Sequence, residues 1–423
     1  MAALTVLHCL AQLPNRTGSG IYYRNLLAEF HKNLPGRQLA LYGQPYGCEV
    51  DWLASDQEFP VLFQNPDLAG PVDLPFPICG MSDEMPYPST IFSQMSEAQL
   101  DLYQEAFRHK LEEIRAQAKP DLIICHHLWI LARLVLEVFP DMPVLGLCHG
   151  TDLRQAQQHP NFKDRYVGNL PGLAGVAALS SLQVKDLEEA YQLDPAKIRV
   201  TGGAYDHQVF YPAEAAQNPH PGTINYLYAG KISHAKGVYE LAEAFDRVSR
   251  EIPEAQLDLV GGPTPEAARE LAARSKHNPH LKLWEAEEQK VLAQHMRRSD
   301  IFVLPSYYEG LGLIALEALA SGLRLVVTDL PALREQMGPE LAHHPAISWV
   351  PMPPLQNLDE PLASALPQHV NNLQAALKDQ ALKYRAEGRP QGLADLVAQH
   401  SWTSLAQKIC SFITEVSGLN LAV

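Results

Sequence analysis

Cysteine is scarce in this chain, and its cysteines are widely spaced. Six cysteines are spread over 423 residues, and no two of them form a C-x-x-C motif. This spacing gives no sign of a structural zinc site. Scattered single thiols are typical of a reduced compartment, so the sequence predicts a cytoplasmic protein.

Long hydrophobic runs and a surplus of positive charge are also missing. No apolar stretch is long enough to cross a lipid bilayer. The apolar N-terminus, Met1–Leu13, has no basic flank, so it is predicted to be a first β-strand rather than a signal peptide. The formal net charge of −15 argues against general binding to nucleic acid or to anionic membranes. It leaves room for a local basic pocket that holds a phosphate.

What the chain does contain is a repeating order of short apolar strand, loop and amphipathic helix. Continuous apolar strands that alternate with helices predict βαβ units, and therefore an α/β fold of two doubly wound parallel sheets. The predicted strands are Leu4–Leu10, Leu39–Tyr42, Asp121–Cys125, Val144–Cys148, Val176–Ser180, Ile198–Thr201, Asn225–Ala229, Leu257–Val260, Leu281–Trp284, Ile301–Leu304 and Leu325–Val327. The predicted helices are Ser19–Asn33, Leu128–Val138, Leu182–Tyr191, Gly237–Arg250, Pro265–Ser275, Glu287–Arg298 and Leu313–Ser321.

Three segments of the sequence lack a strand or helix pattern: a linker between domains, a surface loop and an insertion. The stretch Tyr211–Thr223 is rich in Pro, Asn and Gly and is predicted to link an N-terminal domain, 1–212, to a C-terminal domain, 213–401. Val350–Pro367 is predicted to be a surface loop. The long proline-rich segment Gly43–Gln94 is predicted to be a functional insertion, because such loops in compact domains often are. Its aromatic residues indicate that it still packs on the domain; they are Trp52, Phe59, Phe63 and Phe76.

The strongest candidate for chemistry is the segment Ser306–Gly322, which directly follows a predicted strand. Gly310 and Gly312 allow the backbone to turn sharply and to approach a ligand closely. The helix that begins near Leu313 offers free N–H groups, which form an anion site where a diphosphate could lie.

Glu317 is informative because of its neighbours. Every other residue from Leu313 to Ala320 is Leu, Ile or Ala, so the helix is expected to be buried nearly all round. A carboxylate there needs a partner, since burying it unpaired is costly. The hydroxyls of a nucleotide ribose would supply donors. The alternative is a glutamate exposed through a gap in the packing, or one paired with an arginine such as Arg324.

Two lysines mark a second candidate, the segment Tyr228–Gly237. Lys231 and Lys236 lie beside glycines, Gly230 among them, at a predicted turn from strand to helix. Basic side chains at such a turn suit a phosphate. A solvated surface loop with ordinary lysines is the alternative.

Two loops of the first half complete the set. Gly18, Ser19 and Gly20 follow the first strand and form either a shortened phosphate-binding turn or a simple tight βα turn. His149 ends a later apolar strand, and ligands of open α/β sheets bind beyond the carboxyl ends of strands. His127 follows another predicted strand and is a candidate ligand contact for the same reason. A structural histidine is the alternative at both places.

Taken together, these segments resemble the retaining glycosyltransferases of family GT4, which have the GT-B fold of two Rossmann-like domains that face each other across a cleft. Glu309 and Glu317 match the E-x7-E motif of that family, and the lysine-containing loop is similar to its phosphate site. Gly203–Pro212 is similar to the G-x-D…F-x-P segment that closes the first domain. The segments at Gly18–Gly20 and His149–Asp152 resemble the expected loops of the first half. All of them occur in the family's order.

The resemblance implies a role for each residue. Lys231 and Lys236 would hold the diphosphate of a nucleotide sugar and stabilise the leaving nucleotide, with UDP favoured. Glu309 and His149 would contact the transferred sugar, and Glu317 the ribose. The implied donor-binding residues are Gly18, Ser19, Gly20, Gly230, Gly310, Leu311, Gly312, Leu313 and Glu317. No cofactor and no metal are expected. The family's usual arginine is Lys231 here, which keeps the charge but loses the bidentate geometry. The last helix, about 402–423, would cross back onto the first domain.

The acceptor and three alternatives stay open. An unidentified, soluble hydroxyl acceptor is expected on the first domain, with His127, Trp129, Asp152 and Arg154 as candidates beside the insertion. An epimerase of nucleotide sugars with the same fold would bind the same donor without an acceptor, and a non-catalytic protein would bind it without turnover. A dehydrogenase would need a full G-x-G-x-x-G followed by an acidic residue, which the sequence lacks. Neither nucleic acid nor an integral membrane segment is expected, and the oligomeric state is left open.

Overall fold

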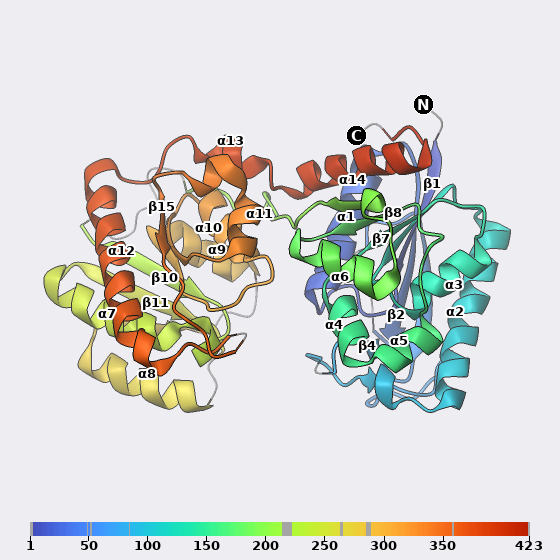
Figure 1. Ribbon diagram of the computed structural model, residues 1–423, viewed down its shortest axis with the longest axis horizontal. Helices are drawn as coiled ribbons and strands as arrows, with labels where there is room; N and C mark the ends of the chain where they lie inside the picture. The colour runs from blue at the N-terminus through green and yellow to red at the C-terminus, as the bar shows by residue number, and fades with distance from the viewer. Residues whose placement is uncertain are drawn as a thin grey trace. The chain divides into compact units, whose positions relative to one another are not determined.

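The computed structural model describes residues 3–48, 50, 53–83, 85–213, 222–262, 265–284, 289–357 and 359–421, with residues 265–267 described by their backbone alone. The chain divides into two compact units, each of which has its own sheet with helices packed on it (Figure 1). Unit 1 consists of residues 1–202 and 402–423, and unit 2 of residues 203–401.

The described strands of unit 1 form a seven-stranded sheet in the order β3-β2-β1-β6-β7-β8-β9, and every pair in it is parallel. Its strands are β1 Leu4–Leu10, β2 Gly36–Pro45, β3 Gln57–Phe63, β6 Leu122–His126, β7 Val144–Leu147, β8 Gly175–Ala178 and β9 Ile198–Val200. Its α-helices are α1 Gly18–Asn33, α2 Glu97–Gln117, α3 Ile130–Val138, α4 Thr151–Gln158, α5 Pro160–Tyr166, α6 Leu182–Tyr191 and α14 Trp402–Ser417. The central strands are buried over their whole length, as expected for a sheet covered on both faces.

The predicted insertion Gly43–Gln94 is part of this unit and partly extends its sheet. It supplies the edge strand β3, and the two short strands β4 Cys79–Gly80 and β5 Thr90–Ile91 pair with each other. Phe59, Phe63 and Phe76 are buried in the unit 1 core, as predicted, whereas Trp52 lies outside the described residues.

In unit 2 the described strands form a six-stranded parallel sheet in the order β12-β11-β10-β13-β14-β15. Its strands are β10 Ile224–Ala229, β11 Ala255–Val260, β12 Leu281–Trp284, β13 Ile301–Leu304, β14 Arg324–Thr328 and β15 Ile347–Val350. Its α-helices are α7 Val238–Glu251, α8 Pro265–His277, α9 Gln289–Arg298, α10 Leu313–Ala320, α11 Pro331–Ala342, α12 Leu366–Glu387 and α13 Leu393–Ala398.

Successive side chains of β10 pack into two different hydrophobic cores, one on each face of the unit 2 sheet. Tyr226 and Tyr228 pack with α7 and α12, whereas Leu227 and Ala229 pack with α9, α10 and α11. This alternation is the period of a strand whose two faces are both covered by helices. The predicted start of α9, Glu287, lies outside the described residues, and the helix is described from Gln289.

The boundary between the units lies after Gly202, before the predicted one at 212. The first residues past it are held by unit 2, because Gln336 bonds both the N–H and the carbonyl of Gly203. Tyr205 donates its N–H to the carbonyl of His400, and Phe210 is buried in a core of unit 2. The predicted linker Tyr211–Thr223 falls mostly outside the described residues.

The last helix, α14, belongs to unit 1. Its first residue, Trp402, packs edge-on against the ring of Tyr22 in α1, with 5.1 Å between the ring centroids. Farther along, Glu415 forms an ion pair of 2.6 Å with Arg199. Residues far apart in the sequence therefore complete one unit.

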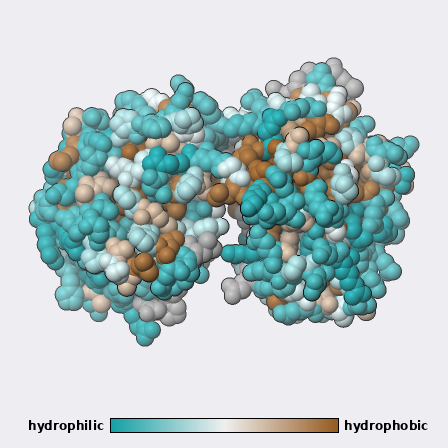
Figure 2. All heavy atoms as spheres, viewed as in Figure 1, coloured by the Kyte–Doolittle hydropathy of each residue, from teal (hydrophilic) through white to brown (hydrophobic). Residues whose placement is uncertain are grey.

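The drawn face of the molecule is mostly hydrophilic, with apolar side chains gathered in small areas (Figure 2). Leu182, at the start of α6, is 64% exposed and is the most exposed large apolar side chain among the described residues. Within the described part of the chain, no helix combines the length and apolar character that a membrane span requires.

Candidate active site

The unit 2 sheet has a topological switch point between β10 and β13. From β10 the chain proceeds in one direction to β11 and β12, and then returns to β13 on the other side of β10. Loops that follow two such strands diverge and leave a crevice at the carboxyl end of the sheet, where ligands of open α/β folds bind. The lysine loop follows β10 and the loop with Glu309 follows β13, so both predicted motifs of unit 2 meet at this point.

The two loops are tied together by hydrogen bonds. Lys236 ends the short 3-10 helix η4, His234–Lys236, and its Nζ donates to Oε1 of Glu309 at 2.7 Å and to the carbonyl of Tyr308 at 3.3 Å. The N–H of Tyr307 donates to the carbonyl of Ala235 at 3.1 Å. An ammonium has three donors, so one is left for a ligand oxygen. Lys231, in the same loop, is exposed.

Helix α10 begins beside this pair without a side-chain cap. Its N-cap residue, Gly312, has the left-handed backbone conformation with φ of 61°, and an added Cβ would come within 2.9 Å of Leu333. At Gly310, in contrast, an added Cβ would meet no atom within 4 Å, so the protein itself leaves space there. The start of an uncapped helix, next to an ammonium and an open space, is suited to an anion.

Glu317 lies one turn further along α10 and is partly exposed. Burial raises its pKa to about 7, and the nearby Asp206 adds to this rise. Among the described residues, no group donates a hydrogen bond to its carboxylate. The arginine considered as its partner, Arg324, instead bonds Glu387 at 2.6 Å and the carbonyl of Gly388 at 3.0 Å. The predicted alternative of a Glu317–Arg324 pair is therefore wrong, and the carboxylate is partly exposed, as the other alternative had it.

A cavity of about 520 Å³ is lined in part by residues from both loops of this site. Its lining residues are His234, Ala235, Glu240, Tyr307, Gln356, Asp359, Glu360, Pro361, Ala363 and Leu366. His234 comes from the lysine loop and Tyr307 from the Glu309 loop. The lining residues from Gln356 onward lie in the segment predicted as a surface loop, Val350–Pro367. That loop is ordered by a hydrogen bond from the Gln356 N–H to the Glu360 carbonyl.

In unit 1, the loop that contains Gly18, Ser19 and Gly20 is held by a glutamine that the sequence did not point to. Gln12 is 2% exposed, and its Nε2 donates to Thr17 Oγ1 at 2.9 Å and to Ser19 Oγ at 2.6 Å. Its Oε1 accepts the N–H of Met81, in the insertion, at 3.4 Å. Thr17 in turn caps α1 by accepting the N–H of Gly20. Gln12 therefore fastens both the glycine loop and the insertion to the end of β1.

Replacing Gln12 with methionine is expected to lower the free energy of unfolding by about 1–3 kcal/mol, because the buried N–H of Met81 would lose its acceptor and the partly buried hydroxyls of Thr17 and Ser19 would lose a donor. The measurement is the urea midpoint of tryptophan fluorescence. Gln117→Met is the matched control on the exposed face of α2, and its midpoint should not change. Equal midpoints for both variants would show that the Gln12 bonds contribute nothing.

Three histidines gather where β6 and β7 end. His149 is partly exposed, and its Nε2 lies 3.1 Å from Nδ1 of His126. His127 packs edge-on against His149 with 4.8 Å between centroids, and its backbone has the left-handed conformation, with φ of 68°. Burial lowers the pKa of all three rings, that of His149 to about 3, so the cluster is neutral at physiological pH.

The four acceptor candidates are not brought together on one surface. Trp129 is 2% exposed and stacks on Phe162, and Asp152 is fully buried, where it accepts the N–H of Leu128 at 2.9 Å. Both are therefore part of the core in this structure. His127 is also buried, although neither of its ring nitrogens has a hydrogen-bond partner among the described residues. Only Arg154 is exposed.

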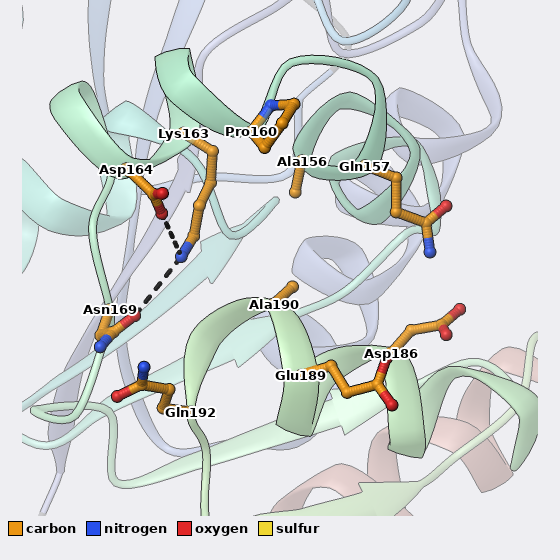
Figure 3. A pocket seen from close by; sticks show the side chains of 10 residues that line it. All are labelled: Ala156, Gln157, Pro160, Lys163, Asp164, Asn169, Asp186, Glu189, Ala190 and Gln192. Atoms are coloured by element: carbon orange, nitrogen blue, oxygen red, sulfur yellow. Dashed lines mark hydrogen bonds and ion pairs between the residues drawn. The ribbon is translucent and has the colours of Figure 1, made fainter.

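A separate polar cavity of about 290 Å³ lies between α4, α5 and α6 (Figure 3). Lys163 extends into it and is held by Asp164 at 3.2 Å and Asn169 at 3.4 Å, and Asp186 and Glu189 lie on the side of α6. None of the predicted site residues lines it. Among the described residues, no group of three or more His, Cys, Asp or Glu side chains is arranged to hold a metal ion.

Known proteins resemble this chain in sequence and in fold. Residues 184–342, which include both motifs of unit 2, match the family described as glycosyl transferases group 1. Alpha-maltose-1-phosphate synthase of Mycolicibacterium smegmatis is 28% identical over 264 residues, which cover 57% of this chain and 63% of that protein. D-inositol 3-phosphate glycosyltransferase of Pseudarthrobacter chlorophenolicus is 28% identical over 253 residues, which cover 53% of this chain and 59% of that protein.

Solved structures extend the likeness of fold to the whole chain. Sucrose-phosphate synthase from Thermosynechococcus elongatus superposes with a TM-score of 0.62 at 18% identity, over 99% of this chain and 100% of that one. The resemblance to GT4 glycosyltransferases and the GT-B fold class are thereby confirmed. The chain spans about three fifths of the length of the two curated relatives named above.

Proposed function

Because residues 184–342 match the group 1 glycosyl transferases and the whole chain has their fold, we propose that this protein transfers a sugar from a nucleoside diphosphate sugar to a hydroxyl acceptor. The observation that carries the proposal is the pairing of Lys236 with Glu309 beside the uncapped start of α10. UDP is the favoured nucleotide, and the configuration at the anomeric carbon is retained.

Each part of the donor has a matching group in unit 2. The diphosphate is bound by Lys231, by the third donor of Lys236 and by the first amides of α10. These groups neutralise its negative charge, so no metal is required. Glu317 accepts hydrogen bonds from the ribose hydroxyls, which supply the donors that the described residues do not. The space beside Gly310 allows the transferred sugar to approach the backbone next to Glu309.

The proposed chemistry follows from these contacts. The bond between the anomeric carbon and the phosphate oxygen breaks, and Lys236 with the α10 amides stabilises the negative charge on the departing nucleotide. The acceptor oxygen bonds the same carbon on the same face, and its proton passes to the leaving phosphate. His149, Gly18, Ser19 and Gly20, which the resemblance assigns to the donor, are proposed as further donor contacts. A soluble acceptor is proposed at Arg154 and the insertion, with His127 as the inner contact.

The test has two stages. A melting-temperature screen with UDP, GDP and ADP identifies the nucleotide, because a ligand that binds only the folded state stabilises it by about 2.7 kcal/mol at 100 times its Kd. The matching nucleotide sugar is then offered with a panel of hydroxyl acceptors, with and without EDTA. We expect nucleotide release that depends on acceptor, survives EDTA, and yields a product whose anomeric proton coupling matches that of the donor.

The outcomes separate the alternatives. Formation of an epimeric sugar or free nucleotide without any acceptor would favour an epimerase. Binding without turnover across the panel would favour a non-catalytic binding protein. Product of inverted configuration would overturn the retaining mechanism while leaving the transferase in place.

A further inference from the structure

Two neighbouring histidines of unit 1 share one hydrogen bond. His126 is the last residue of β6 and is 1% exposed, and His149 follows β7, its parallel neighbour in the sheet. Nδ1 of His126 lies 3.1 Å from Nε2 of His149, and the two rings are inclined by only 14°. The sheet itself therefore fixes the spacing of the pair.

The hydrogen bond couples the tautomers of the two rings. Since burial lowers the pKa of both, each ring carries a single proton at neutral pH, and only one proton lies between them. If His126 donates, His149 must carry its own proton on Nδ1; if His149 donates, its Nδ1 must be an acceptor. Within the described part of the chain, no residue bonds Nδ1 of His149, and this histidine is the partly exposed member of the pair.

We propose that His126 is a positioning residue that locks His149 in one tautomer and one ring orientation, so that Nδ1 of His149 meets the transferred sugar with a fixed hydrogen-bonding role. This inference rests on the proposed function, because it assigns the sugar to His149. A neutral imidazole that could exchange tautomers would present the wrong partner to the sugar hydroxyl part of the time.

Aromatic rings hold the pair in place. Tyr22 packs edge-on against His149 at 5.1 Å and against His126 at 6.0 Å, and Tyr23 packs against His126 at 5.1 Å. Trp402 in turn packs on Tyr22. The ring of His127 also packs edge-on against His149. The packed rings therefore hold the orientation of His149, and the hydrogen bond couples its tautomer to that of His126, whose buried Nε2 has no hydrogen-bond partner among the described residues.

The first experiment measures the tautomer and needs no substrate. In protein labelled with 15N-histidine, the ring nitrogens of His149 are identified by the signals lost in His149→Gln. We expect one neutral tautomer, unchanged between pH 6 and 9. In His126→Phe, which keeps a ring but removes the hydrogen bond, we expect intermediate shifts of two exchanging tautomers.

The second experiment uses two matched variants. Asparagine places a polar atom near the position of Nδ1, whereas glutamine places one near Nε2. With the nucleotide sugar that is active in the transfer assay, His126→Phe and His126→Gln are expected to lower kcat about 10- to 100-fold, the usual effect of losing a supporting hydrogen bond. His126→Asn should restore most of kcat, and KM for the donor should change little in all three.

The results separate this inference from the proposed function. A single unchanged tautomer of His149 in His126→Phe would overturn the inference, even if transfer is confirmed. Equal kcat values for the asparagine and glutamine variants would also overturn it, because a merely structural role would not distinguish them. If the tautomer responds as expected but no nucleotide sugar is turned over, the coupling stands and the proposed function fails.

Discussion

Replacing Lys236 with methionine is expected to lower kcat for sugar transfer by about 10²- to 10³-fold, the effect typical of removing one charge-stabilising donor from an active site. Methionine keeps the length of the side chain but removes the ammonium that bonds Glu309 and Tyr308. Because charge on the leaving phosphate grows as the sugar departs, the loss falls mainly on the transition state. Glu309→Gln should weaken the placement of Lys236 and lower kcat as well.

The control for this prediction is Lys383→Met on α12. Lys383 has a similar exposure, 34% against 28% for Lys236, and forms a bond of similar length, 2.7 Å, with Asp379. Its replacement should leave kcat within about twofold of the wild type, as for ordinary surface positions. Circular dichroism checks that Lys236→Met is folded. A folded Lys236→Met variant with wild-type kcat would remove this residue from the mechanism.

Replacing Glu317 with glutamine is expected to stabilise the unliganded protein at alkaline pH while it abolishes nucleotide binding. The pKa of Glu317 is raised from 4.5 to about 7 in the folded state. Between these values the folded state holds a proton that the unfolded state has released, so stability falls as pH rises through this window. Glutamine is neutral throughout and avoids that penalty, which is at most about 3 kcal/mol and is reduced by the partial exposure of the side chain.

Melting temperature measures both effects. At pH 8 the Glu317→Gln variant should melt about 2–6 °C above the wild type, and at pH 4 the difference should vanish. The rise in melting temperature on adding the nucleotide should be lost. Glu340→Gln, at an exposed position of α11, is the control and should reproduce the wild type in both respects. A Glu317→Gln variant that is no more stable at pH 8 yet still binds nucleotide would contradict the assigned role.

The order of strands and helices in unit 2 could be predicted from the sequence because each motif is a continuous segment. Gly310 and Gly312 lie in the loop before α10 and Glu317 lies within that helix, so all three are close together in the sequence. Lys236 and Glu309 are 73 positions apart, yet the switch point between β10 and β13 brings them together, because parallel strands in this order leave their loops at the same edge.

The first unit was harder to predict because its contacts are long-range. Gln12 is a single polar residue in a loop, and only the folded insertion, through Met81, shows what it holds. Trp129 and Asp152 follow strands as site residues do, but here they are packed into the core. The unit boundary lies before the predicted one, because Gly203 and Tyr205 bond Gln336 and His400, which are far along the chain.

A crystal structure of the protein with the nucleotide that gives the largest rise in melting temperature tests the central claim most directly. The account predicts the diphosphate against the first amides of α10 and Nζ of Lys236, with the ribose hydroxyls at Glu317. Nucleotide bound instead in the polar cavity around Lys163, or diphosphate bound away from the start of α10, would contradict it.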